Sequence, residues 1–212
     1  MNDIFFCRND ILELIYQSDI QGSDITCPLD FYTTIKANRK FKFKFRDTWV
    51  SRDLNGREFN PNMNKLVSHT ESKHRFLKNL PFQVQCCWNG VAVLNPNAFY
   101  GNTSIRFRRS KKEKSECSAS ECSLLCNDFW QKGFRKIVVV PKIRVSYMLK
   151  DAILSNKRYS DEGLFDTDVD EKIRYIHGPK KYFCKGLEAK NEIHPNNPGV
   201  WYEYSTNGTE VL

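Results

Sequence analysis

The order of apolar and polar positions predicts a helix in the middle of the chain. Four apolar side chains recur at three- and four-residue intervals and would share one helix face: Cys122, Leu125, Cys126 and Phe129. Ser118 and Glu121 have the spacing of a capping box. Gly133 stands where a helix commonly ends in a left-handed residue. We therefore expect a helix between Ser118 and Gly133, with Glu121 either closing its capping box or serving chemistry.

A buried strand is expected to follow this helix. Residues 137–140 are continuously apolar and β-branched, which is typical of a strand covered on both faces. Pro141 is expected to end it, and the alternation over 143–147 predicts a second short strand. A helix leading into a buried strand indicates an α/β fold, in which ligands gather at the carboxyl ends of strands. Glu121 and Tyr147 are therefore candidate site residues.

The N-terminal segment predicts a strand end, a turn and a helix. Residues 4–6 are apolar, and Asn9 or Asp10 can cap a helix that carries apolar side chains from Ile11 onward. Asp3 stands beside the strand terminus, where carboxylate oxygens suit magnesium or manganese; a turn aspartate is the alternative. Because the pattern begins in mid-strand, we expect part of the domain to precede it.

Two further segments and a set of acidic residues leave alternatives open. Residues 40–45 alternate lysine with phenylalanine, which indicates a strand with one apolar face and is also found where nucleic acid binds. Asn89-Gly90 favours a tight hairpin turn, or Gly90 lets the backbone approach a ligand with Trp88 as a stacking platform. Four acids suit polyhydroxyl or metal binding, or ordinary turn caps: Asp24, Asp30, Asp47 and Asp53.

The composition indicates one globular domain. The chain has 212 residues, of which 40% are hydrophobic, including 15 Phe, and this suffices for a sizeable core. The net charge of +8 favours acidic partners such as phosphates, without choosing among them. The basic segment 106–114 fits a solvated loop or a clamp on phosphate groups. No apolar run approaches the ~20 residues that a membrane span requires.

The cysteines are interpreted through their spacing. Eight are present, with no facing Cys-x-x-Cys pairs, so a structural zinc site is not expected. The neighbours Cys86 and Cys87 are poorly placed to bridge each other, and we assign no pairing. Sequons at Asn102 and Asn207 would be glycosylated only in a secretory lumen. The Pro/Asn-rich end predicts a loosely ordered tail over 185–212.

Several segments together resemble the fungal α-1,3-mannosyltransferases of glycosyltransferase family 69. The most specific are Gln-Cys-Cys-Trp-Asn-Gly at 85–90 and Ser-Glu-Cys-Ser-Leu at 120–124. The others keep the family's order: Asn-Asp-Ile at 2–4, the segments 23–30 and 47–56, Ile-Arg-Phe-Arg at 105–108, and the segments 139–147 and 178–184. The resemblance covers most of the chain up to about Cys184.

The resemblance implies a fold and an activity. The fold would be an α/β domain of the GT-A-like, Rossmann-like type, partial at its N-terminus, with residues 1–184 as its C-terminal part. The activity would be transfer of mannose from GDP-mannose to a mannose-containing glycan in α-1,3 linkage, with Mn²⁺ or Mg²⁺ as cofactor. The full-length protein would lie in the Golgi lumen, held by an N-terminal membrane anchor outside this chain.

The resemblance also implies roles for individual residues, in three groups. The catalytic residues would be Glu121 and Asp53. The donor would contact Asn2, Asp3, Arg106 and Arg108, with Asp3 as metal ligand. The acceptor would contact Trp49, Arg52, Trp88, Asn89 and Tyr147. The sequence departs from related patterns at two positions where an acid often stands: Met1, two residues before Asp3, and Cys122.

Two other functions remain open at this stage. One is an inactive glycan-binding relative of the family. The other is a basic nucleic-acid-binding module built on residues 36–46 and 106–114, whose binding would weaken steeply with salt. If the chain is a mannosyltransferase, we expect no nucleic-acid partner.

Overall fold

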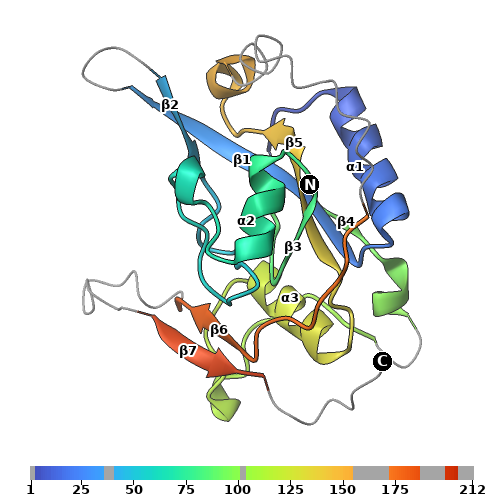
Figure 1. The fold of residues 1–212 in the computed structure, drawn as a ribbon. Coiled ribbons are helices and arrows are strands. Elements are labelled where there is room, and N and C mark those ends of the chain that lie inside the picture. The colour runs from blue at the N-terminus through green and yellow to red at the C-terminus, as the bar shows by residue number, and fades with distance from the viewer. Residues whose placement is uncertain (1–2, 36–40, 101–103, 155–171, 187–198, 205–212) are drawn as a thin grey trace.

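The structure is a computed structural model that describes residues 3–35, 41–100, 104–154, 172–186 and 199–204. It is a mixed α/β arrangement (Figure 1). The helices are α1 Arg8–Gln21, α2 Thr70–Leu77 and α3 Glu121–Gln131, with short 3₁₀ turns at Met63–Lys65, Pro96–Phe99 and Lys112–Lys114. The strands are β1 Ile25–Ile35, β2 Phe41–Phe45, β3 Phe82–Val84, β4 Val93–Leu94, β5 Ile137–Val145, β6 Lys181–Cys184 and β7 Val200–Glu203.

The main sheet is centred on the parallel pair of β1 and β5. The strand order is β2-β1-β5-β3, and β4 pairs with the start of β1. Strands β2 and β4 run antiparallel to β1, and β3 runs antiparallel to β5. The β1–β2 pair confirms the strand expected from the lysine–phenylalanine alternation, within Phe41–Phe45. The carboxyl ends of β1 and β5 therefore meet at one edge of the sheet.

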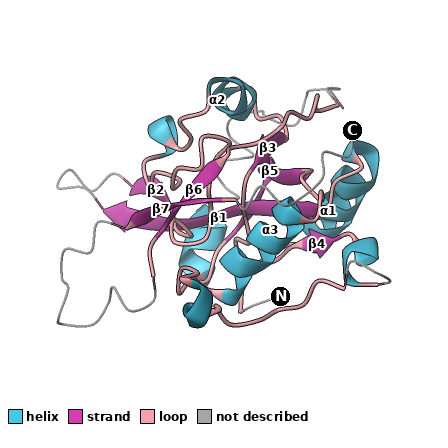
Figure 2. Ribbon diagram, turned by 90° about the horizontal axis from the view of Figure 1, so that it is seen from below, coloured by secondary structure: helices cyan, strands magenta, loops and turns pink. Residues whose placement is uncertain are grey.

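Alternate side chains of β5 enter two separate cores, as the two-residue period of a strand requires. Ile137 and Val139 pack in the larger core with Leu125 and Phe129 of α3. Val138 and Val140 pack in a second core with Leu14 of α1. Figure 2 shows the strands in the middle of the molecule with the three helices around them. This confirms the expected strand that is covered on both faces.

Pro141 does not end its strand, which corrects the sequence prediction. β5 continues through it to Val145, so one strand replaces the two expected. The pairing with β1 shifts register between Cys27 and Leu29, which pair with Val139 and Arg144. Pro28 and Pro141 both lie within this irregular stretch, where a missing N–H costs no regular ladder bond.

Three disulfides cross-link segments that are distant in the sequence. Cys27 of β1 bonds to Cys87, and the neighbouring Cys86 bonds to Cys126 of α3. The third joins Cys117 to Cys184. The vicinal cysteines therefore do not bridge each other but hold the segment before Trp88 to β1 on one side and to α3 on the other. Cys7 and Cys122 are not part of these three disulfides.

The segment after Cys184 contains ordered structure, which corrects part of the predicted tail. Val200–Glu203 forms β7, which pairs antiparallel with β6. Tyr204 packs against Trp130 and Tyr182, with ring centroids 6.3 and 5.0 Å apart. Aromatic burial next to the third disulfide accounts for this order. The rest of the predicted tail lies outside the described residues.

Candidate active site

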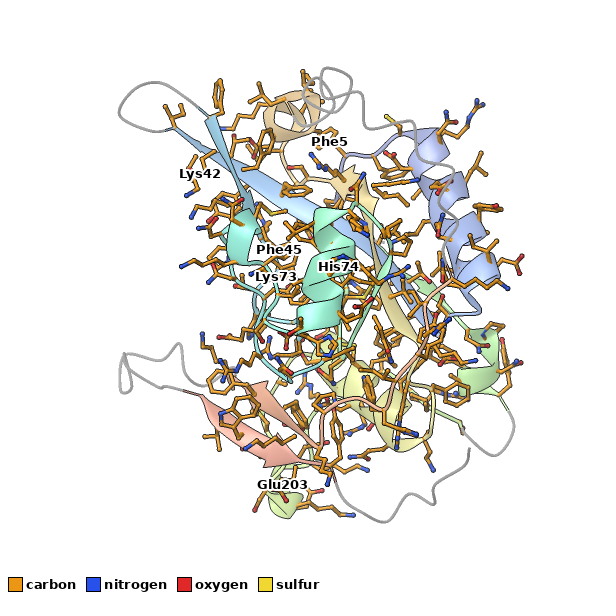
Figure 3. All side chains as sticks on the ribbon, viewed as in Figure 1. Phe5, Lys42, Phe45, Lys73, His74 and Glu203 are labelled. Atoms are coloured by element: carbon orange, nitrogen blue, oxygen red, sulfur yellow. A yellow bond between two sulfur atoms is a disulfide. The ribbon has the colours of Figure 1, made fainter. Side chains whose placement is uncertain are left out.

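The N-terminal segment reaches the carboxyl end of β5. Phe5 forms an isolated antiparallel bridge with Ser146, and its N–H donates to the Ser146 carbonyl at 2.7 Å. Figure 3 shows the labelled Phe5 beside that end of β5. Asp3, two residues earlier, is exposed. The predicted strand end is therefore a single bridge within the described residues, and it brings Asp3 to the edge where α/β proteins bind ligands. Asn2 lies outside the described residues.

The Trp88–Asn89–Gly90 turn packs against this N-terminal segment. Asn89 and Gly90 have φ values of 57° and 86°, as a left-handed turn requires. A Cβ at Gly90 would lie 2.6 Å from Cγ2 of Ile4 and 3.5 Å from the hydroxyl of Tyr147. The flanking strands β3 and β4 pair with β5 and β1, so the expected hairpin is wrong. Gly90 is required because Ile4 occupies the space of a side chain.

Asp47 fixes the turn from the other side. Its carboxylate accepts hydrogen bonds from the backbone N–H groups of Asn89 at 3.1 Å and Val50 at 3.3 Å. The Asn89 amide is fully buried; it donates to the Pro28 carbonyl at 2.6 Å and accepts from the Ser51 hydroxyl at 2.9 Å. Asn89, expected to bind the acceptor, therefore has structural partners on both ends of its side chain.

Asp30 lies in the interior, where the charge of the half-buried Asp47 acts on it. Asp30 is on β1 opposite Val145 of β5, and it is 1% exposed. Burial, and then the charge of Asp47, raise the pKa of Asp30 to about 8, while Arg46 acts in the opposite direction. Burial also raises the pKa of Asp47, although its two backbone hydrogen bonds oppose the shift. The acid-rich segment thus contributes the buried Asp30 and the half-buried Asp47, two of the four acids for which binding or turn capping was expected.

Tyr147 follows β5 and lies half-buried at the same edge. The guanidinium carbon of Arg46 lies 4.6 Å from the centre of its ring, within the range of a cation–π contact. Its hydroxyl reaches the vicinity of Gly90. Tyr147 thus lies at the carboxyl end of β5, near a strand end as predicted.

Glu121 begins α3 but does not close a capping box, which corrects the expected helix start. The N-cap is Ser120, whose hydroxyl accepts from the N–H of Ser123 at 3.3 Å. Glu121 occupies the first helical position and is exposed. Gly133 has a φ of 89° directly after the helix, which confirms the expected left-handed residue at its end. The carboxylate of Glu121 is therefore not needed to cap the helix.

Cys122, at the start of α3, is affected by the charges of both Glu121 and Asp47. The Sγ of Cys122 lies 3.9 Å from Oε1 of Glu121. Burial, followed by the charges of Glu121 and Asp47, raises the pKa of Cys122 to about 12. One helical turn later, the Cys86–Cys126 disulfide ties α3 to the segment before Trp88. The N-terminal segment thus meets the Trp88–Gly90 turn through Ile4, and the disulfide joins α3 to Cys86, two residues before Trp88.

Arg52 and Trp49 line a separate hollow beside α3. Its wall includes Trp49, Arg52, Gln85, Asn127, Tyr182 and Lys185, but neither Asp3 nor Glu121. The Arg52 guanidinium is 5% exposed and donates to the carbonyls of Phe183 at 2.6 Å and Thr48 at 3.1 Å. Arg52 therefore ties the loop after β2 to β6, while Trp49 faces the hollow.

Asp53 holds a loop together, which argues against its predicted catalytic role. It is fully buried, and its carboxylate accepts from the N–H groups of Asn55, Arg57, Ser68 and His69 and from the Ser68 hydroxyl. A carboxylate with five donors and no exposure has no position left for a substrate. The alternative interpretation as a turn cap fits this geometry.

The predicted phosphate ligands differ in availability. Arg108 forms ion pairs with Glu116 at 2.6 Å and Asp128 at 2.7 Å, and these hydrogen bonds raise its pKa. Its guanidinium therefore joins the segment before α3 to Asp128 of that helix, and the two carboxylates take the donors that a phosphate would need. Arg106 is exposed and donates to the carbonyls of Phe99 at 2.5 Å and Ile105 at 2.8 Å.

Trp88 is half-buried and packs edge-on against Phe107, with ring centroids 5.7 Å apart. It also contacts the larger core, so part of its surface serves packing. Among the described residues, no group of three or more His, Cys, Asp or Glu side chains is arranged to hold a metal ion.

Comparisons with known proteins agree with the family resemblance. The family model described as "Cryptococcal mannosyltransferase 1" matches residues 1–128. The chain is also similar to the alpha-1,3-mannosyltransferase CMT1 of Cryptococcus neoformans, with 32% identity over 220 residues. That match covers 95% of this chain and 45% of the relative, so the chain spans less than half of the relative's length. No solved structure matches. Within the described residues, no helix combines the length and apolar character needed to cross a membrane.

Proposed function

The chain belongs to the family described as cryptococcal mannosyltransferase 1, and on that premise we propose that it forms part of an enzyme that transfers mannose from GDP-mannose to a mannose-containing glycan. The new linkage is α-1,3, with retention of the sugar's α configuration. The similarity to an alpha-1,3-mannosyltransferase supports the linkage. The parallel pair of β1 and β5, with the Asp3 segment and Tyr147 at the carboxyl end of β5, supports a GT-A-like arrangement.

The position of Glu121 is the observation that carries this proposal. The carboxylate is exposed at the first position of α3. It is not needed as a cap, because the hydroxyl of Ser120 caps the helix. Glu121 is the first residue of a helix that the Cys86–Cys126 disulfide joins to the segment before Trp88. An exposed carboxylate on a rigid element is suited to accept the proton of a glycan hydroxyl as that hydroxyl attacks the sugar.

Asp3 is the proposed contact to the donor diphosphate through a divalent cation. One exposed carboxylate fits a cation whose other ligands are diphosphate oxygens, and it does not fit a site made of protein ligands alone. When bound, Mn²⁺ or Mg²⁺ would neutralise the charge of the departing diphosphate. The protein's own part is to hold Asp3 at the strand edge through the Phe5–Ser146 bridge.

Trp49, Trp88 and Tyr147 are the proposed aromatic contacts to the acceptor. Each is half-buried and keeps part of its ring accessible, as stacking on a sugar face requires. The three disulfides support placement in an oxidising secretory compartment, and we propose the Golgi lumen.

The test is a transfer assay on this chain and on a longer protein of the family that contains it. The protein is incubated with GDP-mannose, Mn²⁺ and an α-linked mannobiose, and the product is analysed for its linkage. Release of GDP together with an α-1,3-linked trisaccharide is the expected result. Glycan binding without any transfer by the longer protein would instead identify an inactive relative. Salt-sensitive DNA binding without GDP-mannose binding would identify a basic nucleic-acid-binding module.

A further inference from the structure

The buried carboxyl group of Asp30 has no explanation in the packing of the sheet. Asp30 lies in the interior of β1 and is 1% exposed. Among the described residues, its Oδ1 has no hydrogen-bond partner and is buried. An ionised carboxylate left in this state would carry a large desolvation cost. Other buried aspartates in the protein avoid this cost: Asp24, for instance, accepts from the Lys136 N–H at 2.9 Å and from the Asn95 amide at 3.1 Å.

Two charged groups act on the pKa of Asp30, and the negative one has the larger effect. The loop after β2 supplies Asp47 and the opposing charge of Arg46, which also covers the ring of Tyr147. The partner position on β5 is the apolar Val145.

The remaining charged groups nearby are engaged elsewhere. Arg144, the residue before Val145, lies over the ring of Phe31, with 5.4 Å between its guanidinium carbon and the ring centre. Asp151 accepts a hydrogen bond from the hydroxyl of Thr33, which alternation places on the opposite face of β1 from Asp30. On the far side of Asp47, Arg52 and the start of α3 with Glu121 and Cys122 contribute charge.

Asp47 cannot readily take up a proton in place of Asp30. Its carboxylate accepts hydrogen bonds from two backbone N–H groups, which favour the ionised form. Asp30 has no donor directed at its Oδ1, so the neutral acid loses nothing there. When two carboxyl groups share a buried site, one of them stays protonated, and the hydrogen bonds decide which.

We propose that Asp30 is held as a neutral carboxylic acid and acts as a positioning residue: its protonation lets Asp47 alone carry the negative charge that fixes the Trp88–Gly90 turn. Ionisation of Asp30 sets its buried charge against the charge of the half-buried Asp47. Asp47 sits in a loop and is displaced, since Asp30 is held in the centre of the sheet. The displacement reaches Asn89 and Gly90, and through them Ile4 and Tyr147. Burial and Asp47 raise the pKa of Asp30 to about 8, which sets the pH at which this occurs.

The sign of the stability effect follows from proton binding. Between the ordinary pKa of an aspartate and about 8, folded Asp30 keeps a proton that the unfolded chain has lost. Asp30 therefore lowers the free energy of unfolding by an increasing amount as the pH rises through this window, and the effect levels off above about pH 8. One proton of difference changes the unfolding equilibrium constant about tenfold per pH unit.

The first experiment compares urea unfolding of the wild type, Asp30→Asn and Asp19→Asn from pH 4.5 to 9.5. Asn retains the shape of the neutral acid and cannot ionise, while Asp19 is exposed and serves as the matched control. We expect the unfolding constant of the wild type, relative to Asp30→Asn, to rise about tenfold per pH unit up to about pH 8. The Asp19→Asn variant should follow the wild type. Parallel curves for the wild type and Asp30→Asn would overturn the proposal.

The second experiment rests on the proposed function and measures mannosyl transfer against pH. The wild type should lose turnover above about pH 8, whereas Asp30→Asn should keep it. An Asp30→Asn variant that declines in parallel with the wild type would exclude the positioning role. If neither protein transfers mannose at any pH, the proposed function fails, and the positioning role is then decided by the fluorescence of Trp88 in a variant whose other three tryptophans are phenylalanine. A change near pH 8 that Asp30→Asn abolishes supports the role, and an unchanged signal contradicts it.

Discussion

Asp47 accepts a hydrogen bond from the backbone N–H of Asn89 across 42 residues of sequence, at 3.1 Å. This contact joins the loop after β2 to the turn that carries Trp88 and Gly90. The same turn touches Ile4 near the N-terminus and is fixed to α3 through Cys86. The segments that carry Asp3, Tyr147 and Glu121 therefore have one common support.

Replacing Asp47 tests that support. In Asp47→Ala, the N–H groups of Asn89 and Val50 lose their acceptor, and each unpaired buried donor costs about 1–3 kcal/mol of unfolding free energy. The same change removes the negative charge beside Asp30, so the pKa of Asp30 should fall from about 8. Urea unfolding at several pH values measures both effects. A stability loss whose pH dependence matches the wild type would show that the two carboxyl groups are not coupled.

Replacing Glu121 by glutamine tests the proposed chemistry. Glu121→Gln keeps the shape and removes the proton acceptor, so we expect turnover to fall about 100-fold or more. The side chain is exposed and Ser120 caps the helix, so the unfolding free energy should change by less than about 0.5 kcal/mol. Glu71→Gln is the matched control, because Glu71 is an exposed acid in the first turn of α2. Near-wild-type turnover in Glu121→Gln would remove Glu121 from the site.

The sequence predicts local structure well where one period dominates. The apolar spacing over 122–129 predicts α3, and the run over 137–140 predicts a strand buried on both faces. The predicted helix start lies two residues early, because both Ser118 and Ser120 are capping residues and only the tertiary setting selects Ser120. The prediction that Pro141 ends a strand is wrong, since the sequence does not reveal the irregular stretch of β1 that tolerates it.

The site depends on contacts that no local pattern contains. Asn89-Gly90 has the composition of a hairpin turn, but the flanking strands pair with β5 and β1 rather than with each other. Asp53 and Asp47 look alike as acids in a turn-rich segment. The structure separates them, because five donors enclose Asp53, whereas Asp47 accepts from the N–H groups of Val50 and Asn89. Three segments of interest lie outside the described residues: 101–103 with the sequon Asn102, the acidic 155–171, and the C-terminal 205–212 with the sequon Asn207.

Gly178 is predicted to be indispensable for packing. A Cβ at this position would lie 2.0 Å from the Trp130 ring, which is itself fixed by a hydrogen bond from its indole N–H to the Gln85 carbonyl. Gly178→Ala should therefore cost about 1–3 kcal/mol of unfolding free energy through overpacking. In Gly186→Ala, the new methyl group meets its nearest neighbour at 3.8 Å, so the change should be below about 0.5 kcal/mol. Equal stability of the two variants in urea unfolding would contradict the packing of residues 172–180 on α3.

The Cys86–Cys126 disulfide is expected to serve both stability and activity. The bond closes a loop with a sequence separation of 40 residues, and a cross-link of that length stabilises by about 4 kcal/mol through the entropy of the unfolded chain. The double variant Cys86→Ser/Cys126→Ser should lose about this amount in urea unfolding. Cys7→Ser, which changes an exposed cysteine outside the disulfides, should lose less than about 0.5 kcal/mol.

The activity of the same variant separates support of the site from general stability. At a temperature where the double variant is still folded, α3 is no longer tied to the segment before Trp88, and the position of Glu121 relative to the Asp3 segment becomes less defined. Since small displacements of reacting groups lower the rate steeply, mannosyl transfer should fall about 10- to 100-fold without a matching loss of folded protein. The folded fraction is measured by circular dichroism and turnover by release of GDP. Unchanged turnover per folded molecule would mean that the packing of Leu125 and Phe129 against Val139 alone holds α3 in place.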